Sequence, residues 1–223
     1  NHASLCERRS RMRGLIRNNL YSMESNILLA FVLSAFLAVS ALLMKSPAAT
    51  PYIIAIQVFL FVVNIGTSLR ADEISKWSKY EITLPVSRGD LVLAKYVSVV
   101  ILLVLGIFMG AVTVLLSCVS GHMMTLPTLL RGFEVGLTLS FFSIAVMYPL
   151  VLKFGTEKNE LILILSTFGA IGMQLLTAAC LAQWTDGMNM RHPLVEAVST
   201  LVAIIVFFAS YFVSVKIHKG KEF

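Results

Sequence analysis

The chain has 223 residues, of which 57% are hydrophobic and only 13% are charged, whereas roughly a quarter of the residues of a soluble domain are charged. This composition excludes an ordinary soluble domain and indicates an integral membrane protein. The formal net charge of +6 has the sign found in nucleic-acid-binding proteins, but the basic residues follow membrane topology, as described below, and we expect no nucleic-acid partner.

The first 26 residues are polar and basic. Residues 1–11, NHASLCERRSR, precede a methionine that looks like a natural start, so we expect them to be a leader without a role in function. Residues 12–26 have a near-helical period that predicts an amphipathic helix in the cytoplasmic interface of a membrane. The alternative is a frayed basic tail that only sets the orientation. The side chains that define the helix are Leu15, Ile16 and Leu20 on its apolar side and Arg13 and Arg17 on its polar side.

Six apolar runs follow this segment. They are Ile27–Met44, Tyr52–Leu69, Val97–Val119, Phe133–Leu152, Leu161–Gln183 and Leu194–Val215. Each has about the 17 to 25 residues that a helix needs to cross a bilayer. The first run could belong to a cleaved signal peptide, but it is longer than the roughly 7 to 15 apolar residues of such a peptide. The sequence therefore predicts an all-α integral membrane protein, with six transmembrane helices over residues 27–216 and a cytoplasmic tail over residues 217–223.

Small residues recur at four-residue spacing in two of these runs. Ala30, Ser34 and Ala38 lie in the first run, and Gly106 and Gly110 lie in the third. Small side chains at this spacing let helices approach closely, either within one subunit or between subunits. We treat the face of Ala30, Ser34 and Ala38 as a candidate subunit interface.

The distribution of Lys and Arg predicts the orientation. If the N-terminus is cytoplasmic, 15 of the 18 Lys and Arg residues lie on the cytoplasmic side, and only Lys45, Arg131 and Arg191 lie outside. This positive-inside bias places both termini in the cytoplasm.

The sequence contains no motif for catalysis. It has no phosphate-binding loop, no H-E-x-x-H and no G-x-S-x-G. Its four histidines and three cysteines have no spacing typical of metal ligands or of a catalytic pair. We therefore expect no catalytic residue, no metal ligand and no cofactor in this chain.

The carboxylates near the predicted spans all lie within a few residues of a span end. An ion-coupled carrier, in contrast, would place an ionisable group in the middle of the membrane. Glu134 lies one helical turn from Arg131 and is expected to pair with it at the outer interface. Asn64 and Gln174 are the deeper polar residues and are expected to hydrogen-bond neighbouring helices. An ion-coupled carrier is thus disfavoured, and energy for transport would have to come from another protein.

One long charged segment, residues 70–96, separates the second and third runs. Asp72–Glu81 is predicted to be a helix with its two acidic residues in the first turn, and it would display Trp77 and Tyr80 to the cytoplasm. Pro85 should end this helix, and Ser87 should cap a second one that enters the third span. An alternative is an interfacial helix whose aromatic residues rest among the lipid head groups.

Residues Glu73 to Tyr96 contain the pattern E-x-x-x-W-x-x-Y-E-x-x-L-P-x-S-R, followed by K-Y. With a short N-terminal helix and six spans, this pattern resembles the permease subunit of an ABC-2 type exporter. The chain is most similar to the small bacterial permeases of phenol-soluble modulin (Pmt-type) peptide exporters. The similarity in architecture runs from Met12 to the C-terminus, while the motif is confined to the charged segment.

The resemblance implies a coupling helix seated in a cleft of a separate cytoplasmic ATPase. The residues expected to couple to this ATPase are Asp72, Glu73, Lys76, Trp77, Tyr80 and Glu81. It also implies two permease copies, two ATPase copies that bind ATP and Mg, an amphipathic peptide as cargo, and the bacterial cytoplasmic membrane as location. The alternative function is a membrane scaffold or immunity-type protein that recruits a cytoplasmic partner without transport.

Overall fold

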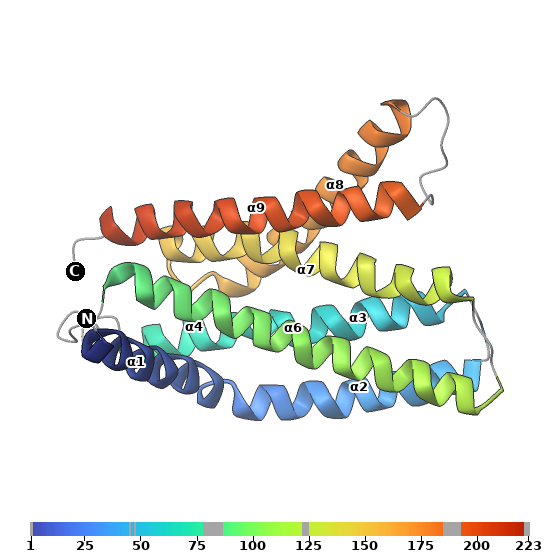
Figure 1. Cartoon of the computed structure of the whole chain (residues 1–223), viewed down its shortest axis with the longest axis horizontal. Coiled ribbons are helices and arrows are strands. Elements are labelled where there is room, and N and C mark those ends of the chain that lie inside the picture. The colour runs from blue at the N-terminus through green and yellow to red at the C-terminus, as the bar shows by residue number, and fades with distance from the viewer. Residues whose placement is uncertain are drawn as a thin grey trace.

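The computed structural model describes residues 2–44, 46, 48–77, 87–121, 125–184 and 193–220, and its regular elements there are all helices. They are α1 (His2–Tyr21), α2 (Glu24–Met44), α3 (Thr50–Val63), α4 (Ile65–Ile74), α6 (Arg88–Val119), α7 (Leu126–Phe154), α8 (Asn159–Trp184) and α9 (Pro193–Gly220). Both termini lie at the same end of the bundle (Figure 1). This end, which carries most of the described Lys and Arg residues, is called the basic end below.

The six predicted spans are confirmed. Six segments of the described chain are long and apolar enough to cross a membrane, and each contains the whole of one predicted run. The helices extend beyond the apolar runs because polar residues continue the helical hydrogen bonding outside the hydrocarbon. The longest, α6, has 32 residues and is about 48 Å long, well beyond the roughly 30 Å of a hydrocarbon core.

The second span consists of two helices, α3 and α4, that meet at Asn64. The Asn64 backbone N–H bonds to the Phe61 carbonyl three residues back, and its side-chain Nδ2 donates to the Leu60 and Phe61 carbonyl oxygens at 3.0 and 3.3 Å. Side-chain donors inserted at a tightened turn interrupt a regular helix. The Asn64 side chain therefore bonds to the backbone of its own span, whereas the sequence predicted a hydrogen bond to a neighbouring helix.

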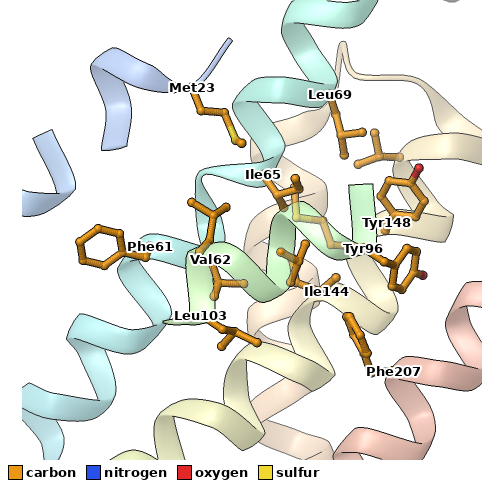
Figure 2. Packing of buried hydrophobic residues seen from close by; sticks show 14 of the residues in the cluster. Met23, Phe61, Val62, Ile65, Leu69, Tyr96, Leu103, Ile144, Tyr148 and Phe207 are labelled. Atoms are coloured by element: carbon orange, nitrogen blue, oxygen red, sulfur yellow. The ribbon is translucent and has the colours of Figure 1, made fainter. Parts of the chain in front are cut away.

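The core lies where α3, α4, α6, α7 and α9 meet, and Figure 2 shows their side chains converging. Phe61 points away toward α2, where its ring meets Phe31 edge-on at 4.9 Å between centroids. Tyr96 of α6 joins the other side, with its ring 5.2 Å from Tyr148 of α7 and 4.9 Å from Phe207 of α9. Aromatic pairs in these edge-on and tilted arrangements add to the burial of apolar surface.

Glycines bring α3 close to both α6 and α7. A Cβ atom on Gly106 of α6 would lie 2.8 Å from the Val58 Cα atom, and one on Gly132 of α7 would lie 2.8 Å from the Pro51 carbonyl oxygen. Side chains larger than hydrogen cannot occupy such contacts unless the backbones move. The α3 helix is therefore held tightly between its two neighbours.

The small-residue face of α2 lies inside the subunit. Ala30, Ser34 and Ala38 are 2%, 0% and 2% exposed, and the Ser34 carbonyl accepts a 2.9 Å bond from Gln57 Nε2 of α3. The expectation of a subunit interface on this face is therefore replaced by packing within one chain. The four-residue spacing of small residues cannot distinguish packing within a subunit from packing between subunits, because it indicates only that another helix lies close.

The N-terminal helix differs from the predicted residues 12–26. It ends at Tyr21, and a turn at Ser22 and Met23 precedes α2. The Ser22 hydroxyl donates to the Asn19 carbonyl at 2.7 Å, and the Met23 side chain is fully buried. A hydroxyl bonded to the backbone and an inward apolar side chain stabilise the turn.

Replacing Gly106 with alanine should lower the thermal stability, because the added Cβ atom meets the α3 backbone at 2.8 Å. Overpacking of this kind costs about 1–3 kcal/mol. Gly169→Ala on α8 is the matched control, since no described atom lies within 4 Å of the place its methyl group would take and alanine favours helix by about 1 kcal/mol. Thermal unfolding of both variants in one detergent measures the difference. Equal stability of the two variants would contradict the close approach of α3 and α6.

Candidate functional site

The candidate site is the basic end of α4, where the charged segment begins. Asp72 and Glu73 occupy the last turn of α4, which ends with Ser75 as its cap and Lys76 at a left-handed φ of 53°. The sequence predicted one helix over Asp72–Glu81 with these carboxylates in its first turn, and this prediction is wrong for the described part. Tyr80 and Glu81 lie outside the described residues, so a coupling helix there stays a prediction.

Carboxylates in a last helical turn face the negative end of the helix dipole. They are stable there only with positive or N–H partners. Asp72 forms an ion pair with Lys95 of α6, whose side chain is 9% exposed while that of Asp72 is 19% exposed. The Lys95 Nζ atom also donates to Ser68 Oγ at 2.7 Å. A largely buried charge is thus satisfied by one carboxylate and one hydroxyl.

The same network reaches the junction of α1 and α2. The Ser22 hydroxyl lies 3.0 Å from Ser68 Oγ, and Asn19 Nδ2 donates to Ser98 Oγ of α6 at 3.3 Å. The turn before the first span is therefore hydrogen-bonded to both α4 and α6.

Glu73 makes a separate contact with the turn between α7 and α8. One of its carboxylate oxygens accepts a hydrogen bond from the Thr156 backbone N–H. Gly155 makes this possible, because its φ of +83° turns the chain after α7 and a Cβ there would lie 3.3 Å from the other Glu73 oxygen. We refer to Ser68, Asp72, Glu73, Lys95 and the Thr156 N–H together as the α4 clamp.

Adjacent residues extend the connections to α9. Tyr96 lies next to Lys95, and its hydroxyl is 2.9 Å from Ser210 Oγ and 3.1 Å from Ser214 Oγ. Arg88 donates from Nη1 to the His218 and Lys219 carbonyl oxygens at 3.1 and 2.8 Å. A guanidinium at a helix C-terminus satisfies unpaired carbonyls and complements the dipole.

The start of α6 follows the prediction. Ser87 is its N-cap, and its Oγ accepts from the Asp90 N–H at 3.2 Å while it lies 2.7 Å from Asp90 Oδ2. Lys95 of the same helix is buried, and its side chain is only 9% exposed. The sequence signal for its buried position is its place in the apolar helical stretch LVLAKYVSVV.

Beyond the clamp, exposed apolar and basic side chains occur at the end of α4. Ile74 is 73% exposed, Lys76 is exposed and Trp77 is half-buried. Arg70 and Glu160 form a 3.9 Å pair, but both side chains are mostly exposed, so it adds little stability. On α1, Arg13 and Arg17 are exposed while Leu15, Ile16 and Leu20 are half-buried.

At the opposite end, the predicted pair of Arg131 with Glu134 is wrong. Arg131 Nε instead lies 2.8 Å from Glu196 Oε1 of α9. Glu134 and Gln174 both line a cavity beside this pair. The pairing could not be foreseen because Glu196 is distant in sequence.

The comparisons with known proteins agree with this architecture. A family model described as "ABC-2 family transporter protein" matches residues 14–219. No curated protein and no solved structure matches the chain significantly.

Lys95→Met should destabilise the protein, because Asp72 would keep its charge in the last turn of α4 without a cation. Breaking a buried pair costs about 3 kcal/mol. The double variant Asp72→Asn, Lys95→Met removes both charges and should regain a large part of that loss. Thermal unfolding of the two single variants and the double variant measures the coupling. A fully additive double variant would contradict a direct ion pair.

Glu73→Ala should speed amide hydrogen exchange at Thr156 by about tenfold, since an N–H bond donated to a charged acceptor contributes about 1.5 kcal/mol. Glu160→Ala is the control, because its exposed pair with Arg70 leaves the turn unchanged. Mass spectrometry of peptides that cover the turn after α7 measures the rate. The same rate in the wild type and in Glu73→Ala would show that Glu73 does not hold this turn.

Proposed function

The chain belongs to the ABC-2 family of transporter proteins, and we propose that it is the permease subunit of an exporter driven by a separate ATPase through the end of α4. The single observation that carries this proposal is the α4 clamp. It joins the basic end of the second span to α6 and to the turn between α7 and α8.

The basic end is the cytoplasmic end in this proposal. In the described part of the chain it contains most of the Lys and Arg residues, as the positive-inside rule requires. The α1 helix lies at this end (Figure 1), and its exposed Arg13 and Arg17 are placed to meet anionic head groups.

The ATPase would bind the surface formed by Ile74, Lys76 and Trp77, together with the predicted coupling residues Tyr80 and Glu81. An exposed isoleucine beside a half-buried tryptophan supplies an apolar anchor outside the hydrocarbon. Lys76 lies between them in the sequence, and its positive charge could pair with acidic residues around the binding cleft of the ATPase. Asp72 and Glu73, which the sequence assigned to direct coupling, act as positioning residues because their carboxylates bond to Lys95 and to the Thr156 N–H of the same chain.

Motion at this surface would pass into the membrane through the clamp. Closure of two ATPase subunits around ATP and Mg provides the free energy for the movement. The end of α4 cannot move alone, because an ion pair and hydrogen bonds tie it to neighbouring elements. Displacing α4 pulls on α6 through Lys95 and on the α7–α8 turn through Glu73. The spans then shift between two arrangements as rigid elements.

The polar groups of Gln57, Thr113 and Ser34, which are buried within the spans, are consistent with energy supplied by another protein, because they are neutral and bond to one another. Gln57 of α3 bonds Thr113 of α6 at 2.9 Å and the Ser34 carbonyl of α2, and all three groups are neutral. They hold helices together as interhelical hydrogen bonds do.

We assign export of an amphipathic peptide across the bacterial cytoplasmic membrane, by a pair of permease copies with two ATPase copies. This assignment is supported by the motif of residues 73–96 and by spans whose outward side chains are largely apolar. An amphipathic cargo can partition into the bilayer and reach a pathway between two such subunits.

Trp77→Ala should reduce co-purification of the partner ATPase by about tenfold or more, the loss typical of an aromatic anchor at an interface. Val119→Ala is the control, because Val119 is an exposed apolar residue at the C-terminal end of α6, far from the basic end. Affinity purification from detergent with candidate ATPases of the same source, followed by ATP hydrolysis, measures the effect. Binding and transport by Trp77→Ala at wild-type levels would overturn the assignment of this surface.

A further inference from the structure

A cavity of about 310 Å³ lies at the end of the bundle opposite the termini. It is formed by α7, α8 and α9, with Tyr52 of α3 at its edge, where α8 leans away from α9 (Figure 1). Its volume equals that of about ten waters at roughly 30 Å³ each. This space suits a small polar head group and is too small for a whole lipid or peptide helix.

The polar lining is unevenly charged. Among the described residues, one cation, Arg131, and two carboxylates, Glu134 and Glu196, border the cavity. Arg131 is engaged by Glu196 at 2.8 Å, so among the described residues the cavity lining holds one more carboxylate than cations. An excess carboxylate at a partly enclosed cavity favours a positively charged ligand group.

Other polar groups at the cavity limit what this positive group can be. Thr138 lies 2.9 Å from Thr200 Oγ1, and Ser199 accepts a bond from Thr177, so both are engaged between helices. The lining also contains the carboxylates of Glu134 and Glu196 and the side-chain amide of Gln174, residues that can supply three acceptor groups. A primary ammonium has three N–H donors and matches them, whereas a quaternary ammonium has none.

The rim of the cavity is apolar and faces the surrounding membrane. Tyr52, Ile171 and Leu175 line the cavity and are 57%, 42% and 60% exposed. A hydrocarbon tail can lie along these side chains while its head group enters the cavity. We infer that this cavity is a lateral binding site for the primary ammonium group of an amphiphile that enters from the bilayer.

The test needs no ATPase, so its result is independent of the proposed coupling. The purified full chain is placed in phosphatidylcholine nanodiscs and titrated with a dansyl-labelled alkyl diamine that keeps one free ammonium group. Glu134→Gln should weaken binding about tenfold or more, since it removes one charge-assisted hydrogen bond. Glu160→Gln, an exposed carboxylate at the basic end, is the matched control and should bind as the wild type does.

Two further measurements make the recognition specific. The trimethylated form of the probe should bind about tenfold more weakly or worse, because it carries the charge without the N–H donors. Ala178→Phe, which fills the cavity from α8, should abolish binding in a protein whose unfolding temperature is otherwise retained. Repeating the Glu134 comparison in an Arg191→Gln background removes any cation contributed by residues 185–192.

The lipid composition of the nanodisc distinguishes the two possible sources of the ammonium group, a lipid head group and another amphiphilic amine. Competition by phosphatidylethanolamine in the nanodisc would assign the site to a lipid head group, and binding unaffected by it would assign the site to another amphiphilic amine, such as a cargo. Both results support the site. Equal binding by wild type, Glu134→Gln and Ala178→Phe, or equal binding of the trimethylated probe, would overturn it.

Discussion

The ion pair between Asp72 and Lys95 is the interaction on which the basic end of this permease depends. A lysine that is 9% exposed is expensive to bury unless a carboxylate and further acceptors satisfy it. Asp72 can supply that carboxylate only if α4 continues past the core and stops beside α6. The left-handed Lys76 and the hydrogen bond that the Thr156 N–H donates to Glu73 then fix where α4 ends. Four parts of the chain, α4, α6, the α1–α2 junction and the α7–α8 turn, meet at this one charged site.

Tight packing inside the membrane places α4 where the ion pair can form. Gly106 and Gly132 allow α6 and α7 to approach α3 at backbone distance, and Tyr96 joins α6 to α9. The opposite end is looser, because α8 is less buried and leans away from its neighbours. The two ends therefore differ in kind: one is held by charged contacts, and the other contains a polar cavity with exposed apolar side chains at its rim.

Features that depend on local sequence could be predicted, and features that depend on distant partners could not. The six spans follow from apolar length, and the cap at Ser87 follows from its position before a helix. Asp72 and Glu73 suggested a helix N-terminus because acidic residues favour that position, but their partners, Lys95 and Thr156, outweigh the dipole. Likewise, Arg131 has Glu134 one turn away yet pairs with Glu196, which only the fold brings near.

The most direct test of the account is the distance between spin labels on Ile74 and Phe154, two exposed residues on the ends of α4 and α7, in a cysteine-free background in nanodiscs. With the clamp intact, the account predicts one narrow distance distribution, which becomes broad when Asp72 is replaced by Asn and Glu73 by Ala. Distributions of equal width in the two proteins would show that these charged contacts do not hold α4 in place. The proposed route from the ATPase into the membrane would then be contradicted.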